Sequence, residues 1–511
     1  MGSTVFGQHN LLPLHSFYKD HMFANKGSSP INTGGFYPAD ESDYNLLGLI
    51  NDSSKQYYSI TETLFKKHVF EVKGDNYYIT ISPAVMLSKG SDLKEYSNGD
   101  DTVRRKLFKN MRGVHAEGDI FDNFSFATSF YENQSRNPIY ERTYYSSVGE
   151  LYPTTGNVYQ TQNAVMPGAG RTKPFKIDAF DYAFAIGYLS YAPRANLKIT
   201  AGNNTQFIGD GHRSLLLSDN SCFAPYLRLV WKPVKKFQVT YYRARLMNLL
   251  RKPTSSSAEN YYESKGYSVN YFTYFPNDKI SISLFEGSLW NRGDSLISKS
   301  SHPLYYNPIP LVSGLALKGK NEVVSLLGVN YSHQLFDNHR IYSQVAMNDL
   351  DIKKVAFQFG YRGYDFFNLN DFMLQLEYNY VAPHAYETEN RRLNYAHYNL
   401  PLAHVKGNGF SEFLLRANYE FKRVYVELTN ILYFTQEYNA KSLLPVYDVL
   451  ALTSGQTLFS NVELGYRVNR KMNLCVYGRW TYRSTFDPLA QNTSVVEVGL
   501  STTLLNHYRD F

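Results

Sequence analysis

The feature that most constrains this chain is a recurring segment of about ten residues in which apolar and polar side chains alternate. The clearest example is the pair 411–421 and 423–434, joined by a turn at Lys422. One face of the first segment carries Phe413, Leu415, Ala417, Tyr419 and Phe421, and the other face carries Arg416, Asn418 and Glu420. In the second segment Val424, Val426 and Leu428 oppose Tyr425, Glu427 and Thr429. A period of two predicts β-strands with one apolar face each.

About 18 such segments follow one another along the chain, which predicts an all-β fold. They lie at 76–87, 112–120, 122–132, 175–191, 196–203, 223–231, 236–246, 266–275, 279–287, 322–335, 339–347, 354–363, 371–382, 411–421, 423–434, 456–469, 471–482 and 494–505. Alternation alone fits both a membrane barrel and a soluble β-sandwich.

The connections between the segments favour the barrel. Short polar turns alternate with long loops, except near Asp349–Asp351, where a short connection replaces a long one. A single-chain up-and-down antiparallel barrel has short periplasmic turns and long extracellular loops, and an even strand number leaves both chain ends in the periplasm. We therefore expect Asn260, Asn307 and Asn390 at the cell surface, and Asp278 and Arg470 on the periplasmic side.

Composition agrees with a transmembrane β-barrel. The chain holds 45 Tyr and 33 Phe but only 3 Trp, its mean hydropathy is −0.39, and no stretch approaches the roughly 18 consecutive apolar residues of a membrane helix. Without such a helix a chain crosses a bilayer only as a closed barrel. Barrels of this kind commonly end in a strand that closes on an aromatic residue, which Phe511 would supply, although Arg509 departs from the pattern. A large secreted all-β protein is the alternative on composition alone.

The first 75 residues do not have the strand pattern. Residues 1–8 look like a residual signal or expression stub. In 9–75, apolar residues at helical spacing (Leu11, Leu14, Phe17, Tyr18 and Met22) predict a first helix, with further helices expected over 40–50 and 59–70. We expect a small helical periplasmic segment at 9–75, acting as a plug or a simple cap, before a barrel at 76–511.

Several classes of function are disfavoured. The net charge of +7 is spread along the chain, so nucleic acid is not expected as a partner. Cys222 and Cys475 are too far apart to suggest a structural disulfide, and no metal-ligand spacing occurs. No catalytic motif stands out among the 13 His. We expect no enzyme activity, no catalytic residue, no metal and no cofactor.

Charged residues on the inward faces of the strands predict a polar lumen. By strand parity the inward arginines are Arg228, Arg416, Arg467 and Arg479, and the inward acids are Glu117, Glu377, Glu427, Glu463 and Glu497. Turn geometry places Glu463 diagonally near Arg479, and Arg416 near Glu427. A lumen charge network of Arg416, Glu427, Glu463, Arg467, Arg479 and Glu497 would either brace a wet interior or line a pore that selects charged or sugar-like solutes.

The loop at 201–222, AGNNTQFIGDGHRSLLLSDNSC, differs from the others. Gly209 and Gly211 allow tight turns around Asp210, and three leucines at 215–217 are too apolar for an external loop. We expect the leucines to fold the loop back into the barrel mouth. Two interpretations stay open: a structural constriction, or a polysaccharide site formed by exposed polar residues (Asp210, His212, Arg213, Ser214, Asp219 and Asn220, with Arg228 of the next strand).

This loop, followed by APYLRL, closely resembles the signature of the Wzi-like outer-membrane proteins, and most strongly that of the Bacteroidota RemB-like branch associated with gliding motility. The opening LPLHSFYKD is also similar to that branch. Together the motifs touch about a tenth of the chain. Positions that match the shared loop pattern are Gly209, Gly211, Arg213, Ser214, Leu215, Leu217, Ser218, Asn220 and Pro225. The resemblance implies an 18-stranded barrel with an N-terminal helical bundle and, in enterobacterial members, a lectin-like role in capsule attachment.

Three functions are compatible with the sequence. The first is an outer-membrane barrel that binds or anchors surface polysaccharide, with support of gliding motility as an additional role. The second is a porin-like diffusion channel, and the third is a structural component of a motility or secretion assembly. The expected partners are outer-membrane lipid and lipopolysaccharide, surface polysaccharide, and proteins of such machinery.

Overall fold

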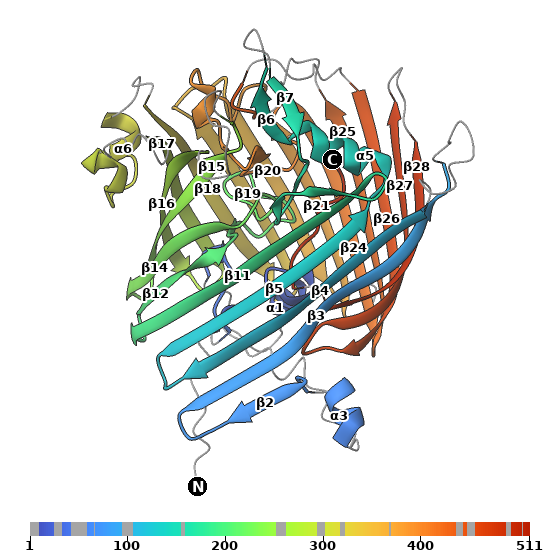
Figure 1. Ribbon diagram of the computed structural model, residues 1–511. Coiled ribbons are helices and arrows are strands. Elements are labelled where there is room, and N and C mark those ends of the chain that lie inside the picture. The colour runs from blue at the N-terminus through green and yellow to red at the C-terminus, as the bar shows by residue number, and fades with distance from the viewer. Residues whose placement is uncertain are drawn as a thin grey trace.

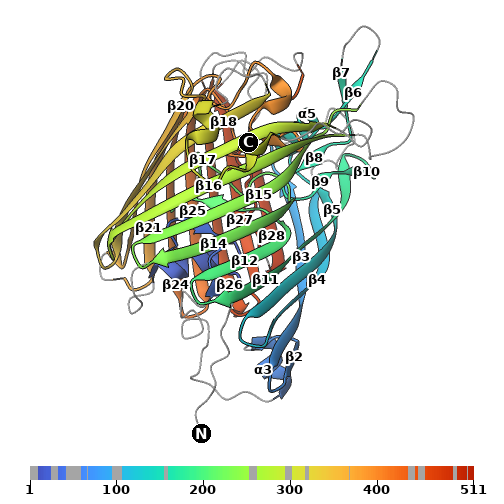
Figure 2. The same ribbon diagram turned by 90° about the vertical axis from the view of Figure 1, so that its left-hand side faces the viewer.

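A computed structural model gives the structure of the chain. It describes residues 10–24, 33–41, 59–65, 67–94, 106–154, 159–251, 262–293, 302–316, 322–366, 369–435, 443–446, 455–486, 492–502 and 504–511. The described strands of the main sheet form one closed antiparallel barrel (Figures 1 and 2), which confirms the predicted fold.

The barrel has 18 strands, as the segment count predicted. They are β3 (Tyr77–Asp92), β4 (Lys106–Ile120), β5 (Phe124–Arg136), β11 (Ala179–Arg194), β12 (Leu197–Asn204), β14 (Ala224–Val234), β15 (Phe237–Asn248), β16 (Glu263–Asn277), β17 (Ile280–Gly293), β18 (Val323–Phe336), β19 (His339–Asn348), β20 (Val355–Tyr364), β21 (Phe372–Val381), β24 (Phe410–Phe421), β25 (Val424–Thr435), β26 (Gly455–Asn469), β27 (Leu474–Phe486) and β28 (Thr493–Thr502). Each pairs with the next, and β28 pairs with β3 from Val495↔Asp92 to Ser501↔Met86 to close the ring. Closure pairs the strand edges, which a barrel in lipid requires.

The other described helices and strands are short. They are α1 (Ser16–Ala24), β1 (Phe36–Tyr37), α3 (Ser59–Phe65), β2 (Phe70–Lys73), α5 (Ile139–Ser147), β6 (Glu150–Pro153), β7 (Tyr159–Gln162), β8 (Val165–Met166), β9 (Gly170–Arg171), β10 (Lys173–Phe175), β13 (Phe207–Ile208), η3 (Pro303–Tyr306), α6 (Val312–Ala316), η5 (Arg391–Leu393), β22 (Ala396–His397) and β23 (Leu400–Pro401). None of the described helices has the length and apolar character needed to cross a membrane.

The outer wall is apolar, as the alternation predicted. Val424 and Val426 expose 45% and 39% of their surface, whereas Tyr425 between them exposes 1%. The same outward exposure recurs along neighbouring strands at Leu464, Val476 and Val498. An exposed aliphatic wall around a closed ring is the construction of a transmembrane barrel.

The connections alternate in length as expected. Figure 2 shows the short turns at one end and the long connections, with β6, β7 and α5, at the other. The exception is also confirmed, because β19 joins β20 through only 349–354. We call the two ends the short-turn mouth and the long-loop mouth.

The N-terminal region contains strands as well as helices. Helices α1 and α3 agree with two of the expected helices, and the expected helix at 40–50 falls almost wholly outside the described residues. The expectation that this region lacks strands is wrong. Strand β1 pairs with β13, and β2 pairs with residues 78–81 of β3, below the part of β3 that β28 covers.

The end of the chain does not close the barrel. Strand β28 ends at Thr502, and residues 504–511 turn back through the lumen. The Phe511 ring stacks on Tyr144 of α5, with 4.1 Å between centroids. Because α5 lies at the long-loop mouth (Figure 1), the predicted closing strand on Phe511 and the predicted location of this end at the short-turn mouth are both wrong.

Candidate functional site

The segments inside the lumen include α1, residues 33–41 with β1, the loop 205–223 and the C-terminal segment 504–511. Helix α1 lies inside the ring (Figure 1) and buries Phe17, Tyr18, Asp20 and Met22. The loop and the C-terminal segment contact one another and the wall. We describe the loop first, because the sequence placed the candidate ligand site there.

The leucines of the loop lie in the main core of the barrel. Leu215 and Leu216 are fully buried and Leu217 is 4% exposed. They pack with Tyr242, Tyr271 and other apolar residues that point inward from the wall. Tyr386 and Tyr395 donate hydrogen bonds to the carbonyls of Leu215 and Leu216. The prediction that the leucines fold the loop back into the barrel is confirmed.

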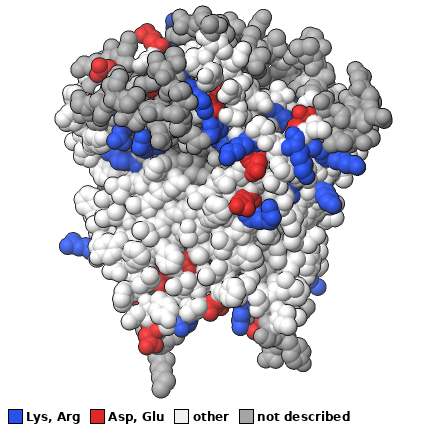
Figure 3. All heavy atoms as spheres, in the orientation of Figure 1, with Lys and Arg blue, Asp and Glu red and all other residues white. Residues whose placement is uncertain are grey.

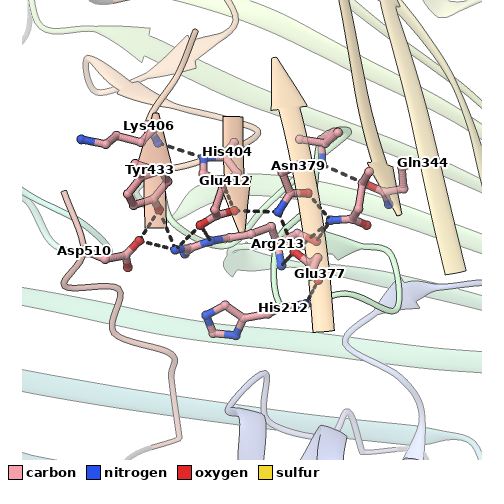
Figure 4. Close-up of polar contacts among 12 residues, drawn as sticks. His212, Arg213, Gln344, Glu377, Asn379, His404, Lys406, Glu412, Tyr433 and Asp510 are labelled. Atoms are coloured by element: carbon pink, nitrogen blue, oxygen red, sulfur yellow. Dashed lines mark hydrogen bonds and ion pairs between the residues drawn. The ribbon is translucent and has the colours of Figure 1, made fainter. Parts of the chain in front are cut away.

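Arg213 is the centre of a buried polar network (Figure 4). Its Nε donates to Glu412 of β24 at 3.1 Å, and its Nη2 donates to the Tyr433 hydroxyl at 2.9 Å and to Asp510. The backbone N–H of Arg213 donates to Glu377 at 3.1 Å. One side chain therefore ties the loop to two strands and to the C-terminal segment.

The positive charge of Arg213 lies between the carboxylates of Glu412 and Asp510. Burial disfavours the charged guanidinium, but the carboxylates of Asp510 and Glu412 outweigh it and hold the pKa of Arg213 well above its ordinary value. His404 and Asn379 complete the hydrogen bonds of Glu412, at 2.8 and 2.6 Å. Arg213 is a structural tie through its Nε and Nη2 bonds, because removal of one partner would leave a charge uncompensated.

The expectation that the loop exposes its polar side chains is wrong. Arg213, Asp210, Ser214 and Asn220 are at most 3% exposed, and only His212 and Asp219 are half-buried. Internal bonds take up most of their polar atoms, because a polar group that is buried without a partner costs free energy. These bonds leave few groups free for a sugar.

The predicted site residues also spread around the lumen. Asp210 accepts from Tyr37 and Arg340, each at 3.1 Å. Burial opposes its ionisation, but Arg340 holds the pKa of Asp210 below its ordinary value.

The other predicted site residues bond to different parts of the lumen. Asp219 accepts from Tyr508 and Asn506, and Asn220 donates to the Pro401 carbonyl. Arg228 donates to the Pro38 carbonyl and to Gln206, both at 3.0 Å, and Ser214 donates to the Ile208 carbonyl.

The predicted charge network lies on the lumen side of β24 to β28. Arg479 donates to Glu463 at 2.7 Å, and the two residues face each other directly in the register, not diagonally as predicted. Glu497 bonds to Arg509 of the C-terminal segment at 3.2 Å and lies 3.7 Å from Arg479. Arg467 pairs with Glu420 at 2.9 Å and with Glu427 at 3.3 Å.

The two members of the predicted pair Arg416 and Glu427 bond to other partners. Arg416 bonds Asp20 of α1 at 3.1 Å and Gln375 at 2.9 Å, whereas Glu427 pairs with Arg467. The plug helix competes for the arginine, and no sequence signal places Asp20 inside the barrel. The wall charges thus hold α1 in the lumen.

A polar cavity of about 160 Å³ lies between this network and the plug. Its lining includes His15 just before α1, His212 of the loop, His507 and Arg509 of the C-terminal segment, and the wall residues Arg416, Glu427, Glu463, Arg467 and Arg479. Burial lowers the pKa of His212 and of His507 well below the ordinary value, so both rings are neutral. The cavity has room for several water molecules. Within the described part of the chain, no group of three or more His, Cys, Asp or Glu side chains could hold a metal ion.

A second polar cluster, which we call the Glu150 cluster, lies at the long-loop mouth. It consists of Glu150, Asn163, Arg171, Arg251 and Tyr262. Burial opposes ionisation, but hydrogen bonds from Tyr262, Asn163 and Arg251 hold the pKa of Glu150 below its ordinary value. The sequence analysis missed this cluster because its members lie in two connections that are far apart in the sequence, between β5 and β11 and between β15 and β16.

The Glu150 cluster supports an exposed tyrosine. Tyr152 on β6 exposes 38% of its surface, and the Arg251 guanidinium lies 5.7 Å from its ring centre. The backbone on either side is fixed, since Leu151 donates to the Leu249 carbonyl and accepts from the Arg251 N–H, each at 2.9 Å. An exposed ring on a rigid base, with the Arg251 guanidinium beside it, can stack on a pyranose and bond its hydroxyls.

Comparisons with known proteins support the fold. No protein-family model matches the chain, and no curated protein matches it in sequence. The solved structure of Wzi from Escherichia coli, described as an outer membrane protein involved in group 1 capsule assembly and a carbohydrate-binding β-barrel, aligns with a TM-score of 0.55 at 9% identity, over 96% of this chain and 99% of that one.

Porin structures align less well. OccK9 of Pseudomonas aeruginosa aligns with a TM-score of 0.40 at 12% identity, and a BenF-like porin of Pseudomonas fluorescens Pf-5 with 0.43 at 9% identity. Each alignment covers 83% of this chain and 97% of the porin. The Wzi likeness supports a Wzi-like barrel fold, and the porin scores are too low to add to it.

Proposed function

We propose that this chain is an outer-membrane β-barrel that holds surface polysaccharide at its long-loop mouth. The observation that carries the proposal is the filled lumen. Helix α1, the loop 205–223 and the segment 504–511 occupy the interior, and Arg213 and Arg416 tie them to the wall. A barrel closed in this way offers its outer mouth to a ligand.

The Glu150 cluster and Tyr152 are the proposed sugar contacts. Tyr152 supplies a stacking face, and Arg251 and Arg171 supply donors for hydroxyl or carboxylate groups. This choice moves the contacts from the residues first considered, Asp210 to Asn220, to a position that solvent reaches. The carbohydrate binding described for Wzi agrees with this proposal, although at 9% identity it is support from the fold alone.

Binding of the host's surface polysaccharide by the purified protein tests the proposal. Tyr152→Ala is expected to weaken binding about fivefold, because a stacked aromatic contact contributes about 1 kcal/mol. Tyr77→Ala is the matched control, since Tyr77 exposes 41% of its surface on β3 near the short-turn mouth. Equal binding by wild type and Tyr152→Ala, or equal loss in the control, would contradict the assignment.

Conductance in planar bilayers separates this function from a diffusion channel. The tied plug predicts no steady conductance for the wild type, whereas a porin conducts. A large steady conductance would contradict the polysaccharide proposal and favour a porin-like diffusion channel. The charged cavity beside α1 does not by itself favour a channel, because residues of the plug line it as well as the wall.

A role in gliding motility, or in a motility or secretion assembly, rests on the likeness of two sequence motifs to the RemB-like branch. Deletion of the gene, with surface spreading and capsule retention scored in the same cells, would test it. Loss of spreading with capsule intact would favour the motility role.

A further inference from the structure

The outer wall carries two groups of outward-facing polar side chains near the long-loop mouth. In the first, on β15 to β17, Arg243 donates to Asn270 at 2.9 Å, and Asn270 donates to Glu286 at 3.2 Å. Segment 302–316 covers this group, because the Gly314 N–H donates to Glu286 at 2.9 Å and Asn270 donates to the Asn307 carbonyl. This packing also argues against Asn307 as a freely exposed loop position.

The second group, on β3 and β4, is exposed. Lys89, Lys106 and Arg112 point outward and are exposed, while their chain neighbours Ser88, Leu107 and Met111 are buried. Within the described part of the chain no hydrogen bond or ion pair engages their side chains. Figure 3 shows Lys and Arg, interspersed with Asp and Glu, on this face in the upper part of the wall, below the loops.

The register places these three cations in one patch. Strands β3 and β4 are neighbours in which Lys89 lies opposite Phe108, and Lys106 lies opposite Ser91. Arg112 lies opposite Val85 on β3 and Glu132 on β5. The cations therefore lie on the outward face of two paired strands, within roughly 20 Å along the strand direction. Leu87 and Asn110 occupy the outward row between Lys89 and Arg112, and Leu87 exposes 42% of its surface.

The patch ends where the apolar wall begins. One outward position further toward the short turns, Val114 and Phe130 face each other and expose 45% and 48% of their surface. Beside Lys89 on β28, Val498 exposes 61%. Cations immediately above a lipid-facing apolar band lie at the height of the lipid headgroups.

We infer that Lys89, Lys106 and Arg112 bind the phosphate groups of a phosphorylated glycolipid in the outer leaflet, of the lipid A type. Exposed cations beside hydrocarbon attract an anionic partner, and the lipid supplies phosphate at that height. The exposed Val114, Phe130 and Val498 pack against its acyl chains. Glu132 lies within reach of a divalent cation that bridges its carboxylate to a phosphate.

The inference rests on the proposed outer-membrane location and not on polysaccharide binding. It also fixes the orientation, because only the outer leaflet carries this glycolipid, and so it places the long-loop mouth outside the cell. Failure of the glycolipid test would leave the Tyr152 site standing, and failure at Tyr152 would leave this patch standing.

The test is binding of bis-phosphorylated lipid A to the folded protein in detergent with Mg²⁺, measured by native mass spectrometry. Dephosphorylated lipid A, phosphatidylglycerol and inorganic phosphate are the comparison ligands. The variant is Lys89→Gln, Lys106→Gln and Arg112→Gln together. The matched control removes three exposed cations at the short-turn mouth, Lys235→Gln, Lys236→Gln and Lys279→Gln.

The expected result is preferential binding of the phosphorylated lipid, a loss of about tenfold or more in the patch variant, and little change in the control. Heat-modifiable mobility in gels reports that both variants fold. The inference is overturned if the patch variant folds and binds as wild type does. It is also overturned if the control loses as much affinity, or if phosphatidylglycerol or inorganic phosphate binds equally well.

Discussion

The two halves of the lumen are built in opposite ways. On the side of β15 to β18 the wall presents Tyr242, Val269 and Phe285 to the leucines of the loop, and these residues are at most 3% exposed. On the side of β24 to β28 the wall presents paired charges around a cavity of about 160 Å³. We call these the dry half and the wet half.

The difference shows how one barrel holds a plug. Apolar packing in the dry half fixes the loop without requiring matched geometry for each atom, because the hydrophobic effect is non-directional. Charges in the wet half require partners or water, and the cavity provides room for water. Arg213 lies between the halves and is tied to both Glu412 and Asp510. A charge change should therefore cost most in the dry half and least in the wet half.

The largest effect is expected for Leu216→Asp. A carboxylate at a fully buried apolar position loses the packing of the leucine, at about 2–5 kcal/mol, and adds several kcal/mol for an unpaired buried charge. We expect release of the loop, lower resistance to urea and a new conductance in planar bilayers. Leu216→Met, expected to cost below about 1.5 kcal/mol, is the control. If Leu216→Asp has no conductance and unfolds at the same urea concentration as the wild type, the dry half does not hold the plug.

Arg213→Met is expected to destabilise the folded barrel by about 3–5 kcal/mol, because Glu412 and Asp510 would remain buried without their cation. Urea unfolding followed by gel mobility measures the loss. Addition of Glu412→Gln and Asp510→Asn should recover part of the stability, since the uncompensated charges are then removed. If the single variant is as stable as wild type, Arg213 is not the tie between the halves.

An arginine on the lipid side gives a reference for the two luminal sites. Val426→Arg should cost roughly 2–4 kcal/mol if it lies near the middle of the membrane. Val426→Leu should be neutral, and the same unfolding assay applies. Equal folding and insertion of Val426→Arg would mean that the outward face of β25 has been assigned incorrectly.

The smallest effect is expected for Glu427→Gln in the wet half. The Glu427 side chain is 25% exposed and pairs with Arg467 at 3.3 Å, while Glu420 also holds Arg467. Water in the cavity can replace the lost pair, so we expect a change below about 1 kcal/mol. A loss as large as that of Arg213→Met would remove the distinction between the halves.

Much of the barrel wall could be predicted from the sequence. Strand positions and inward or outward facing follow from a period of two, which is a local property, so Val426 and Arg416 were placed on the correct faces. The pairing of Glu463 with Arg479 followed from strand order and turn length. Its direct register did not, because a turn of several residues allows more than one register.

The contents of the lumen could not be predicted in the same way. The leucines signalled burial of the loop, but nothing near Arg213 in the sequence indicates Asp510, which lies 297 residues away. Likewise no local pattern marks Asp20 as the partner of Arg416. Candidate sugar contacts were therefore sought in the loop with the most distinctive sequence, whereas the exposed Tyr152 lies on a hairpin without a distinctive motif.

The sequence by itself determined the wall of this protein, namely the strand count, the apolar exterior and the polar interior. Only the tertiary structure decided what fills the ring and which polar groups stay exposed. The physical reason is that alternation acts between adjacent residues and paired neighbouring strands, whereas a plug is selected by contacts among segments that meet only after the barrel has closed.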